Sequence, residues 1–165
     1  MKNTLAYVAM LSMVFLFAQR ALASDVATKT SHCAADQVLP DSVCTPGATL
    51  TTSTSTICVV GYTKTVRLVT RTTKRKLFRA YDIPWSLRGN YEVDHLISLE
   101  LGGSNALTNL WPESYDITDG ALEKDQFENH LHKAVCRGLM PLKEAQSEIA
   151  NDWLSYYKKW KHKML

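Results

Sequence analysis

Several patterns are missing from this 165-residue sequence, and each absence narrows the class of protein. The four cysteines show no Cys-x-x-Cys spacing, which argues against a structural zinc site. The longest apolar run, residues 5–17, falls short of the roughly 20 residues that a membrane-spanning helix needs. No cysteine follows that run as in a lipoprotein, and no base-reading module is visible. The sequence therefore predicts neither a zinc finger nor a membrane-anchored protein.

A strong net charge is also missing. The formal net charge is +3, and Lys2 and Arg20 both lie in an N-terminal segment that we expect to be removed. A nearly neutral chain argues against indiscriminate binding of polyanions. The positive charge is nevertheless concentrated in residues 64–79, which contain seven basic residues before the next acid: Lys64, Arg67, Arg71, Lys74, Arg75, Lys76 and Arg79. This run is either a solvated face or a phosphate-binding surface.

Residues 1–23 have the features of a signal peptide. Lys2 provides a positive start, the apolar run follows, and Ala21-Leu22-Ala23 has the small-x-small pattern of a cleavage site. We expect an exported protein, periplasmic or secreted, that begins near Ser24 and has no membrane association after cleavage.

An exported chain with an even number of cysteines predicts two disulfides among Cys33, Cys44, Cys58 and Cys136. Three pairings are open. We favour one bridge within the early segment and one that joins Cys58 or Cys44 to the helix carrying Cys136. Residues 24–55, rich in Ser, Thr and Pro, are interpreted as a loop-rich, disulfide-anchored arm, and residues 56–165 as the functional domain.

The rest of the pattern predicts an α+β fold. Residues 57–69 favour an extended segment, and residues 70–81 a basic helix capped by Thr72 or Thr73. Residues 91–101 alternate as a strand, and a short return strand begins at residue 109 and is closed by Pro112.

Two further helices are predicted. Residues 121–137 form one, capped by Thr118 or Asp119 and ended by Gly138. Residues 141–160 form an amphipathic C-terminal helix with a buried stripe. Its predicted members are Leu142, Ala145, Ile149, Trp153 and Tyr156.

Asp94 and His95 form the main candidate site. A histidine titrates near neutral pH and can act as a general base, while a carboxylate is a hard oxygen ligand that suits Mg²⁺. Adjacent residues on a regular strand point to opposite faces, so a bulge or a strand end is needed to bring both to one site. The alternative for His95 is a hydrogen-bonded structural histidine.

The motif Asp94-His95-Leu96-Ile97, followed by Leu99-Glu100-Leu101-Gly102-Gly103 and Asn109-Leu110-Trp111-Pro112, resembles the core of HNH endonucleases, the ββα-metal nucleases. The sequence is most similar to exported bacterial proteins of this kind. It shares with them Cys-Thr-Pro-Gly at 44–47, Ile-Cys-x-x-Gly-Tyr-Thr at 57–63 and Lys-Asp-x-x-Glu-Asn-x-Leu-His at 124–132. The resemblance covers about residues 40–155 and implies a small ββα-metal core, a hairpin plus a helix.

The resemblance also implies roles for individual residues. His95 would be the general base, Asp94 a metal ligand, and Asn109 the residue that holds the hairpin loop. The family usually supplies a further His or Asn ligand early in the helix, where this chain has Asp119-Gly120-Ala121.

Candidates for the missing ligand lie further along the helix, at i, i+3, i+4 and i+7: Asp125, Glu128, Asn129 and His132. We expect Asp125 first, then Glu128, with His132 binding metal or positioning phosphate. These residues could equally form pairs on a solvated face. Substrate contacts are expected from Lys124, Arg75, Lys76 and Arg79.

The predicted function is an exported endonuclease that uses one divalent ion, Mg²⁺ or alternatively Mn²⁺ or Zn²⁺, to hydrolyse DNA or RNA with little sequence specificity. The alternative is a non-enzymatic exported binding module on a degenerate scaffold of the same kind. A toxin-like effector with an immunity protein as partner is a third hypothesis, which no residue pattern favours.

Overall fold

The computed structural model describes residues 29–36, 38–118 and 120–164. The expected signal peptide and the expected cap Asp119 lie outside the described residues. Among the described residues, none of the helices combines the length and apolar character that crossing a bilayer requires.

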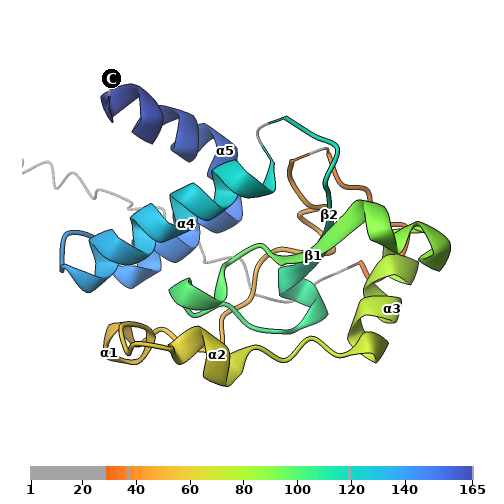
Figure 1. Cartoon of the computed structure of the whole chain (residues 1–165), viewed down its shortest axis with the longest axis horizontal. Coiled ribbons are helices and arrows are strands. Elements are labelled where there is room, and N and C mark those ends of the chain that lie inside the picture. Colours follow the sequence, from red (N-terminus) through yellow and green to blue (C-terminus); the bar gives the residue numbers. More distant parts are fainter. Residues whose placement is uncertain (1–28, 37, 119, 165) are drawn as a thin grey trace, which may run out of the picture.

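A two-stranded antiparallel hairpin occupies the middle of the fold, which confirms the predicted α+β class (Figure 1). Strand β1 (Tyr91–His95) pairs with β2 (Leu110–Ser114), with Asp94 opposite Trp111. Helix α3 (Arg71–Ala80) lies on one side of the hairpin, and α4 (Ala121–Cys136) and α5 (Leu142–Met164) lie together on the other. The shorter elements are α1 (Thr54–Ile57), α2 (Tyr62–Val66) and three 3₁₀ turns, Trp85–Asn90, Leu99–Leu101 and Leu107–Asn109.

Two apolar clusters hold these elements together. The larger one packs the apolar faces of α4 and α5 against Ile57, Tyr62 and Leu101. The smaller one packs Leu77 and Tyr81, from the end of α3, against the hairpin and the first disulfide. The hairpin therefore lies between two packed layers, and its connecting loop has a fixed position.

The expected extended segment 57–69 is wrong. The chain forms α1 and α2 there, separated by a turn at residues 58–61, and residues 67–70 after α2 belong to no helix or strand. The Thr and Val residues of this segment favour strands, but β1 and β2 pair only with each other in the sheet of the described residues. Burial of Ile57 and Tyr62 in the apolar cluster with α4 decides the local structure instead. Tertiary packing commonly overrides β propensity in this way.

The first strand is shorter than predicted. Strand β1 ends at His95, and Leu99–Leu101 form a 3₁₀ turn rather than a continuation of the strand. Gly103 lies so close to this loop that a Cβ there would overlap the carbonyl oxygen of Ile97. The glycine pair thus folds the loop back on itself. Strand β1 therefore ends at the second residue of the Asp-His pair.

The helices agree with prediction apart from their ends. Thr70, rather than Thr72 or Thr73, caps α3 by accepting a hydrogen bond from the Thr73 amide at 3.1 Å. Helix α4 ends as expected before Gly138, whose φ of 71° favours glycine.

Helix α5 runs to Met164 and is interrupted by non-helical backbone at Asp152. The stripe is buried as predicted through Trp153, and Tyr157, four residues later, is buried in place of the expected Tyr156.

Both disulfides follow the favoured pairing. Cys33–Cys44 closes a loop within the arm, and Cys58–Cys136 joins the segment after α1 to the end of α4. The arm is also docked by Thr45, whose hydroxyl donates to the Leu110 carbonyl oxygen at 3.0 Å. Two disulfides suit an oxidising compartment.

The two disulfides should differ in their effect on stability. Cys58–Cys136 spans 78 residues and Cys33–Cys44 spans 11. On the chain-entropy estimate, they stabilise by roughly 4.5 and roughly 3 kcal/mol respectively. We expect the double variant Cys58→Ala, Cys136→Ala to lose more free energy of unfolding in urea than Cys33→Ala, Cys44→Ala. The reverse order would show that strain or packing, not loop closure, decides the contribution.

Candidate functional site

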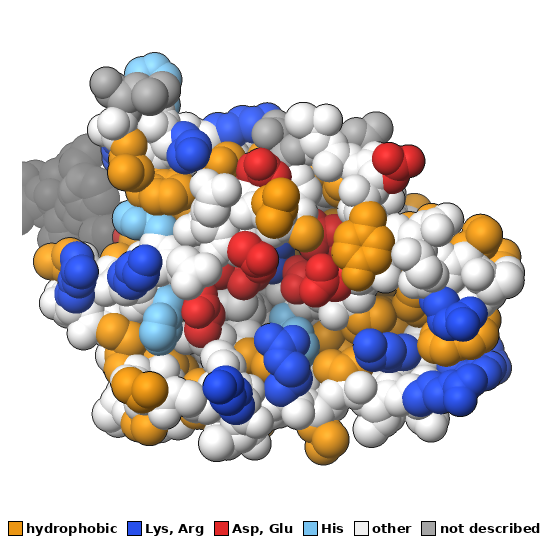
Figure 2. Space-filling view, viewed as in Figure 1, with side chains coloured by type: hydrophobic (Ala, Val, Ile, Leu, Met, Phe, Trp, Pro, Cys, Tyr) orange, Lys and Arg blue, Asp and Glu red, His pale blue; other side chains and the backbone are white. Residues whose placement is uncertain are grey.

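Five carboxyl groups lie together where the hairpin meets α4, and we call them the acidic cluster: Glu92, Asp94, Glu113, Asp125 and Glu128. Glu92 and Glu113 are directly opposed on the two strands, and Asp94 follows Glu92 on the same face. Figure 2 shows acidic side chains gathered in the middle of this face, with Lys and Arg side chains below them.

Lys124 lies inside the acidic cluster. Its side chain is 1% exposed, and its Nζ is 2.7 Å from Asp94 Oδ2 and donates to Glu128 Oε1 and, at 2.8 Å, to the carbonyl oxygen of His95. Burial alone would lower the pKa of Lys124, but the carboxylates of Asp94 and Glu128 outweigh it and raise that pKa. Lys124 is therefore a buried cation that joins α4 to β1. Because its ammonium is buried among these oxygens, it is not exposed for the expected contact with a substrate.

The other carboxyl groups of the acidic cluster have raised pKa values. Burial, followed by the negative charge of Asp94, raises the pKa of Glu92 and Asp125. The same two causes raise the pKa of Glu113 to about 8. Its side chain is 1% exposed, and Oε1 has no hydrogen-bond partner within the described part of the chain. A carboxyl with a raised pKa keeps its proton to higher pH, so burial limits the negative charge that this cluster carries near neutral pH.

His95 ends β1 with its ring inside the protein. The residue is 3% exposed, and burial lowers the pKa of its imidazole. Nε2 lies 3.2 Å from Asn105 Oδ1. The Asn105 amide is itself oriented, because its Nδ2 donates to the Val66 carbonyl oxygen at 2.8 Å and its Oδ1 accepts from the Leu68 amide at 3.1 Å.

These contacts select one tautomer of His95. Asn105 Oδ1 is an acceptor, so Nε2 of His95 carries the proton and Nδ1 carries the lone pair. A lowered pKa keeps the ring neutral near pH 7. The arrangement therefore holds an imidazole in the state that a general base needs.

Asn109 lies where the resemblance implied, at the base of the loop that joins the strands. It is fully buried. Its Oδ1 accepts from the Ile97 amide at 2.9 Å, and its Nδ2 donates to the carbonyl oxygens of Ile97 and Ser104 at 2.9 Å each. One side chain thus fixes both ends of the loop that follows His95.

A polar cavity of about 250 Å³ adjoins the acidic cluster and is lined by Arg67, Glu100, Asp125, Glu128 and Asn129, together with Thr63, Ser98 and Leu99. Two of the four expected metal ligands, Asp125 and Glu128, face this space. Carboxylate oxygens in a polar cavity fit Mg²⁺, which is commonly held by one or two carboxylates and keeps several waters. Asp94 does not line this cavity, and the Lys124 ammonium contacts both Asp94 and Glu128.

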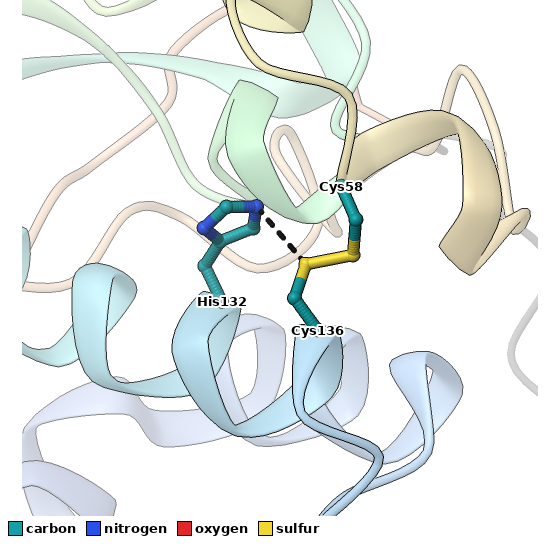
Figure 3. A group of neighbouring side chains, drawn as sticks. All are labelled: Cys58, His132 and Cys136. Atoms are coloured by element: carbon teal, nitrogen blue, oxygen red, sulfur yellow. Dashed lines mark hydrogen bonds between the residues drawn. A yellow bond between two sulfur atoms is a disulfide. The ribbon is translucent and has the colours of Figure 1, made fainter.

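His132 lies elsewhere, next to the second disulfide (Figure 3). Its Nε2 is 3.2 Å from the Ile57 carbonyl oxygen and 3.4 Å from Cys136 Sγ. Within the described residues, Cys58, His132 and Cys136 are the set of three whose donor atoms lie close enough to share an ion. The sulfurs are bonded to each other, so this group could hold a metal only if the disulfide were absent.

The basic residues divide between two places. Arg67, Arg71, Lys74 and Arg88 line a groove beside β1. Of the expected substrate contacts, Lys76 and Arg79 line a different cavity, and Arg75 lies over the Trp85 ring at 4.7 Å.

Three residues of the site were missed by sequence reasoning: Glu92, Asn105 and Glu113. Arg67 was named only as one member of the basic run 64–79. Glu92 lies on β1 and Glu113 on β2, and only the pairing register of the strands shows that they are opposite each other. Asn105 follows the Gly-Gly pair closely, which is the one local signal that could have identified it.

Comparison with family models, with curated proteins and with solved structures gave no match. The function must therefore be argued from the geometry of the site.

Removal of the buried cation should destabilise the fold. Lys124→Met leaves Asp94 and Glu128 facing each other without a counter-charge, and we expect a loss of about 3–5 kcal/mol in chemical denaturation. The matched control is Lys133→Met on the exposed side of α4, with a change within about 0.5 kcal/mol. Adding Glu128→Gln to Lys124→Met should recover part of the loss. Equal effects of the two lysine variants would contradict this role.

Glu113 should make stability depend on pH. Its pKa is raised from 4.5 to about 8 on folding, so the unfolded chain releases this proton at lower pH than the native chain does. The contribution to stability is present below about pH 4.5 and is lost as pH rises toward 8. Glu113→Gln should therefore gain stability relative to the parent at pH 8 and not at pH 4, measured by thermal unfolding. A difference that is the same at both pH values would exclude this linkage.

Proposed function

We propose that this protein is an exported endonuclease that hydrolyses phosphodiester bonds of nucleic acid at the site formed by β1 and α4. The observation that carries the proposal is the contact between the buried His95 ring and Asn105. Asn105 holds the ring in one tautomer next to Asp94 in the chain, and Arg67 joins a basic groove to a carboxylate-lined cavity nearby. The resemblance to HNH endonucleases supports the same assignment.

His95 would act as the general base. Its Nδ1 accepts the proton of a water molecule as that water attacks phosphorus, and Asn105 keeps the ring from rotating away. Asn109 and the Lys124 contact to the His95 carbonyl oxygen hold the backbone on either side. The base is thus positioned by side chains from the loop and from α4.

Positive charge is needed where the phosphate becomes more negative. Arg67 is exposed, lies close enough to affect the electrostatics of His95, and lines the cavity that contains Asp125 and Glu128. It is placed to hold a phosphate oxygen. A divalent ion held by Asp125 and Glu128 would supply further charge at the phosphate when present.

Replacement of His95 tests the base directly. We expect His95→Ala to lower the rate of nicking of a supercoiled plasmid, or of cleavage of RNA, by roughly 10²–10⁴-fold, because a positioned base contributes that much. The protein is assayed with its disulfides formed, with Mg²⁺ or Mn²⁺ and with EDTA. EDTA should abolish cleavage.

His162→Ala is the matched control, since His162 is exposed near the end of α5. Far-ultraviolet circular dichroism of each variant separates loss of the base from loss of the fold. The proposal fails if the parent cleaves neither DNA nor RNA with any of several divalent ions, or if His95→Ala cleaves as fast as the parent.

A second candidate is a nucleic-acid-binding module without hydrolysis. The observation that favours it is the position of Lys124, whose ammonium fills the gap between Asp94 and Glu128. A binding module predicts that binding needs no divalent ion and survives Asp94→Ala, in which Lys124 keeps Glu128 as its partner. Binding that strictly requires a divalent ion would exclude it.

A further inference from the structure

We propose that a groove beside the site binds a single-stranded segment of nucleic acid, with phosphates on its basic side chains and a base stacked on its exposed aromatic rim. We call it the basic-aromatic groove, formed by residues 67–70, one face of α3, the turn Trp85–Asn90 and β1, with Tyr115 after β2. The inference rests on the proposed function and names the substrate class of that site.

The size of the basic-aromatic groove suits a short polymer segment. Its volume is about 920 Å³, at the upper end of the range of roughly 300–1,000 Å³ for ligand pockets. Its polar and aromatic residues are Arg67, Thr70, Arg71, Lys74, Phe78, Trp85, Arg88, Tyr91, Glu92 and Tyr115. Cations and aromatic rings therefore line the same surface.

The charges in the groove match a phosphate backbone. Arg67, Arg71, Lys74 and Arg88 are all exposed, and Glu92 is the one acid among the lining residues. Clustered Lys and Arg gain affinity for polyanions by releasing counterions. The chain as a whole has a small net charge, so the excess of positive charge in the groove comes from the arrangement of these residues and not from the overall composition.

The aromatic rings have a rigid base. Phe78 is buried and meets Trp85 and Tyr91 edge to face, with centroid distances of 5.5 and 6.0 Å. The Trp85 ring is already covered by guanidinium groups, from Arg75 at 4.7 Å and Arg88 at 5.3 Å. Tyr115, which is 61% exposed at the end of β2, is the ring at the rim that is open to a ligand.

An open ring beside cations favours a single strand over a duplex. In a duplex the faces of the bases are stacked on one another, whereas a single strand can place a base face on an aromatic side chain. Each such stack contributes enough affinity to be measured, and it does not depend on sequence. This agrees with the absence of a base-reading module in the chain.

The groove also leads to the proposed catalytic site. Arg67 lines both the basic-aromatic groove and the cavity of Asp125 and Glu128, and Glu92 and Val93 of β1 form part of the groove wall. A strand that follows the groove toward Arg67 therefore reaches the cavity lined by Asp125 and Glu128.

Binding of a fluorescein-labelled oligothymidylate, followed by anisotropy in EDTA, tests the inference without cleavage. We expect single-stranded DNA to bind at least about tenfold more tightly than a duplex of the same length. Arg71→Ala with Lys74→Ala should weaken binding and reduce the salt slope of log Kd by about 1.4, the value for two phosphate contacts on a single strand.

The matched control is Lys76→Ala with Arg79→Ala, which removes the same charge from the same helix but from a different cavity. Tyr115→Ala should weaken binding by roughly tenfold, and Tyr115→Phe should bind like the parent, because the ring and not the hydroxyl carries the stack. Tyr115 is largely exposed, so neither change should alter the fold.

The inference is overturned if duplex and single strand bind equally, if the two charge variants lose the same affinity, or if Tyr115→Ala binds like the parent. Its failure is distinguishable from that of the nuclease proposal. Groove-dependent binding without cleavage would leave the inference standing and reject hydrolysis. Cleavage with unchanged binding in the Arg71→Ala, Lys74→Ala variant would do the opposite.

Discussion

The buried ammonium of Lys124 is the contact on which the site depends. It joins Asp94 and the carbonyl oxygen of His95 on β1 to Glu128 on α4, so one side chain sets the distance between hairpin and helix. A buried cation is costly unless it is fully paired, and here each of its three contacts is to an oxygen atom of the site. The same contact separates Asp94 from the cavity of Asp125 and Glu128. It therefore decides which carboxylates can act together.

Two asparagines extend this order to the loop after β1. Asn109 closes the loop through hydrogen bonds to Ile97 and Ser104. Asn105 lies in the same loop, and its side chain contacts the ring of His95. Neither residue needs to touch a substrate to matter. Their amides fix the direction and the tautomer of an imidazole whose burial keeps it neutral. The oriented imidazole, the acidic cluster and the basic groove are the features on which the proposed hydrolysis rests.

Local patterns predicted much of this architecture. The helical spacing before Tyr81 and after Gly120, and the alternation around Asp94, gave the right elements because burial on one face imposes those periods. The prediction of an extended segment at residues 57–69 was wrong, because these strand-forming residues have no neighbouring strand to pair with in the described structure. The end of β1 at His95 was also not predictable from alternation, because apolar residues continue through Leu101 and are buried in a turn instead.

The sequence by itself determined the α+β class, the pairing preference of the cysteines and the Asp94-His95 pair, because each depends on neighbouring residues or on a short list of alternatives. The tertiary structure decided which charges meet. Lys124 was expected to face a substrate, yet it lies among carboxylates from two elements, and the groove uses Arg71 and Lys74 rather than Lys76 and Arg79. Position along a helix fixes a face, but only the packing of that helix against the hairpin determines whether the face meets solvent, a carboxylate or a cavity.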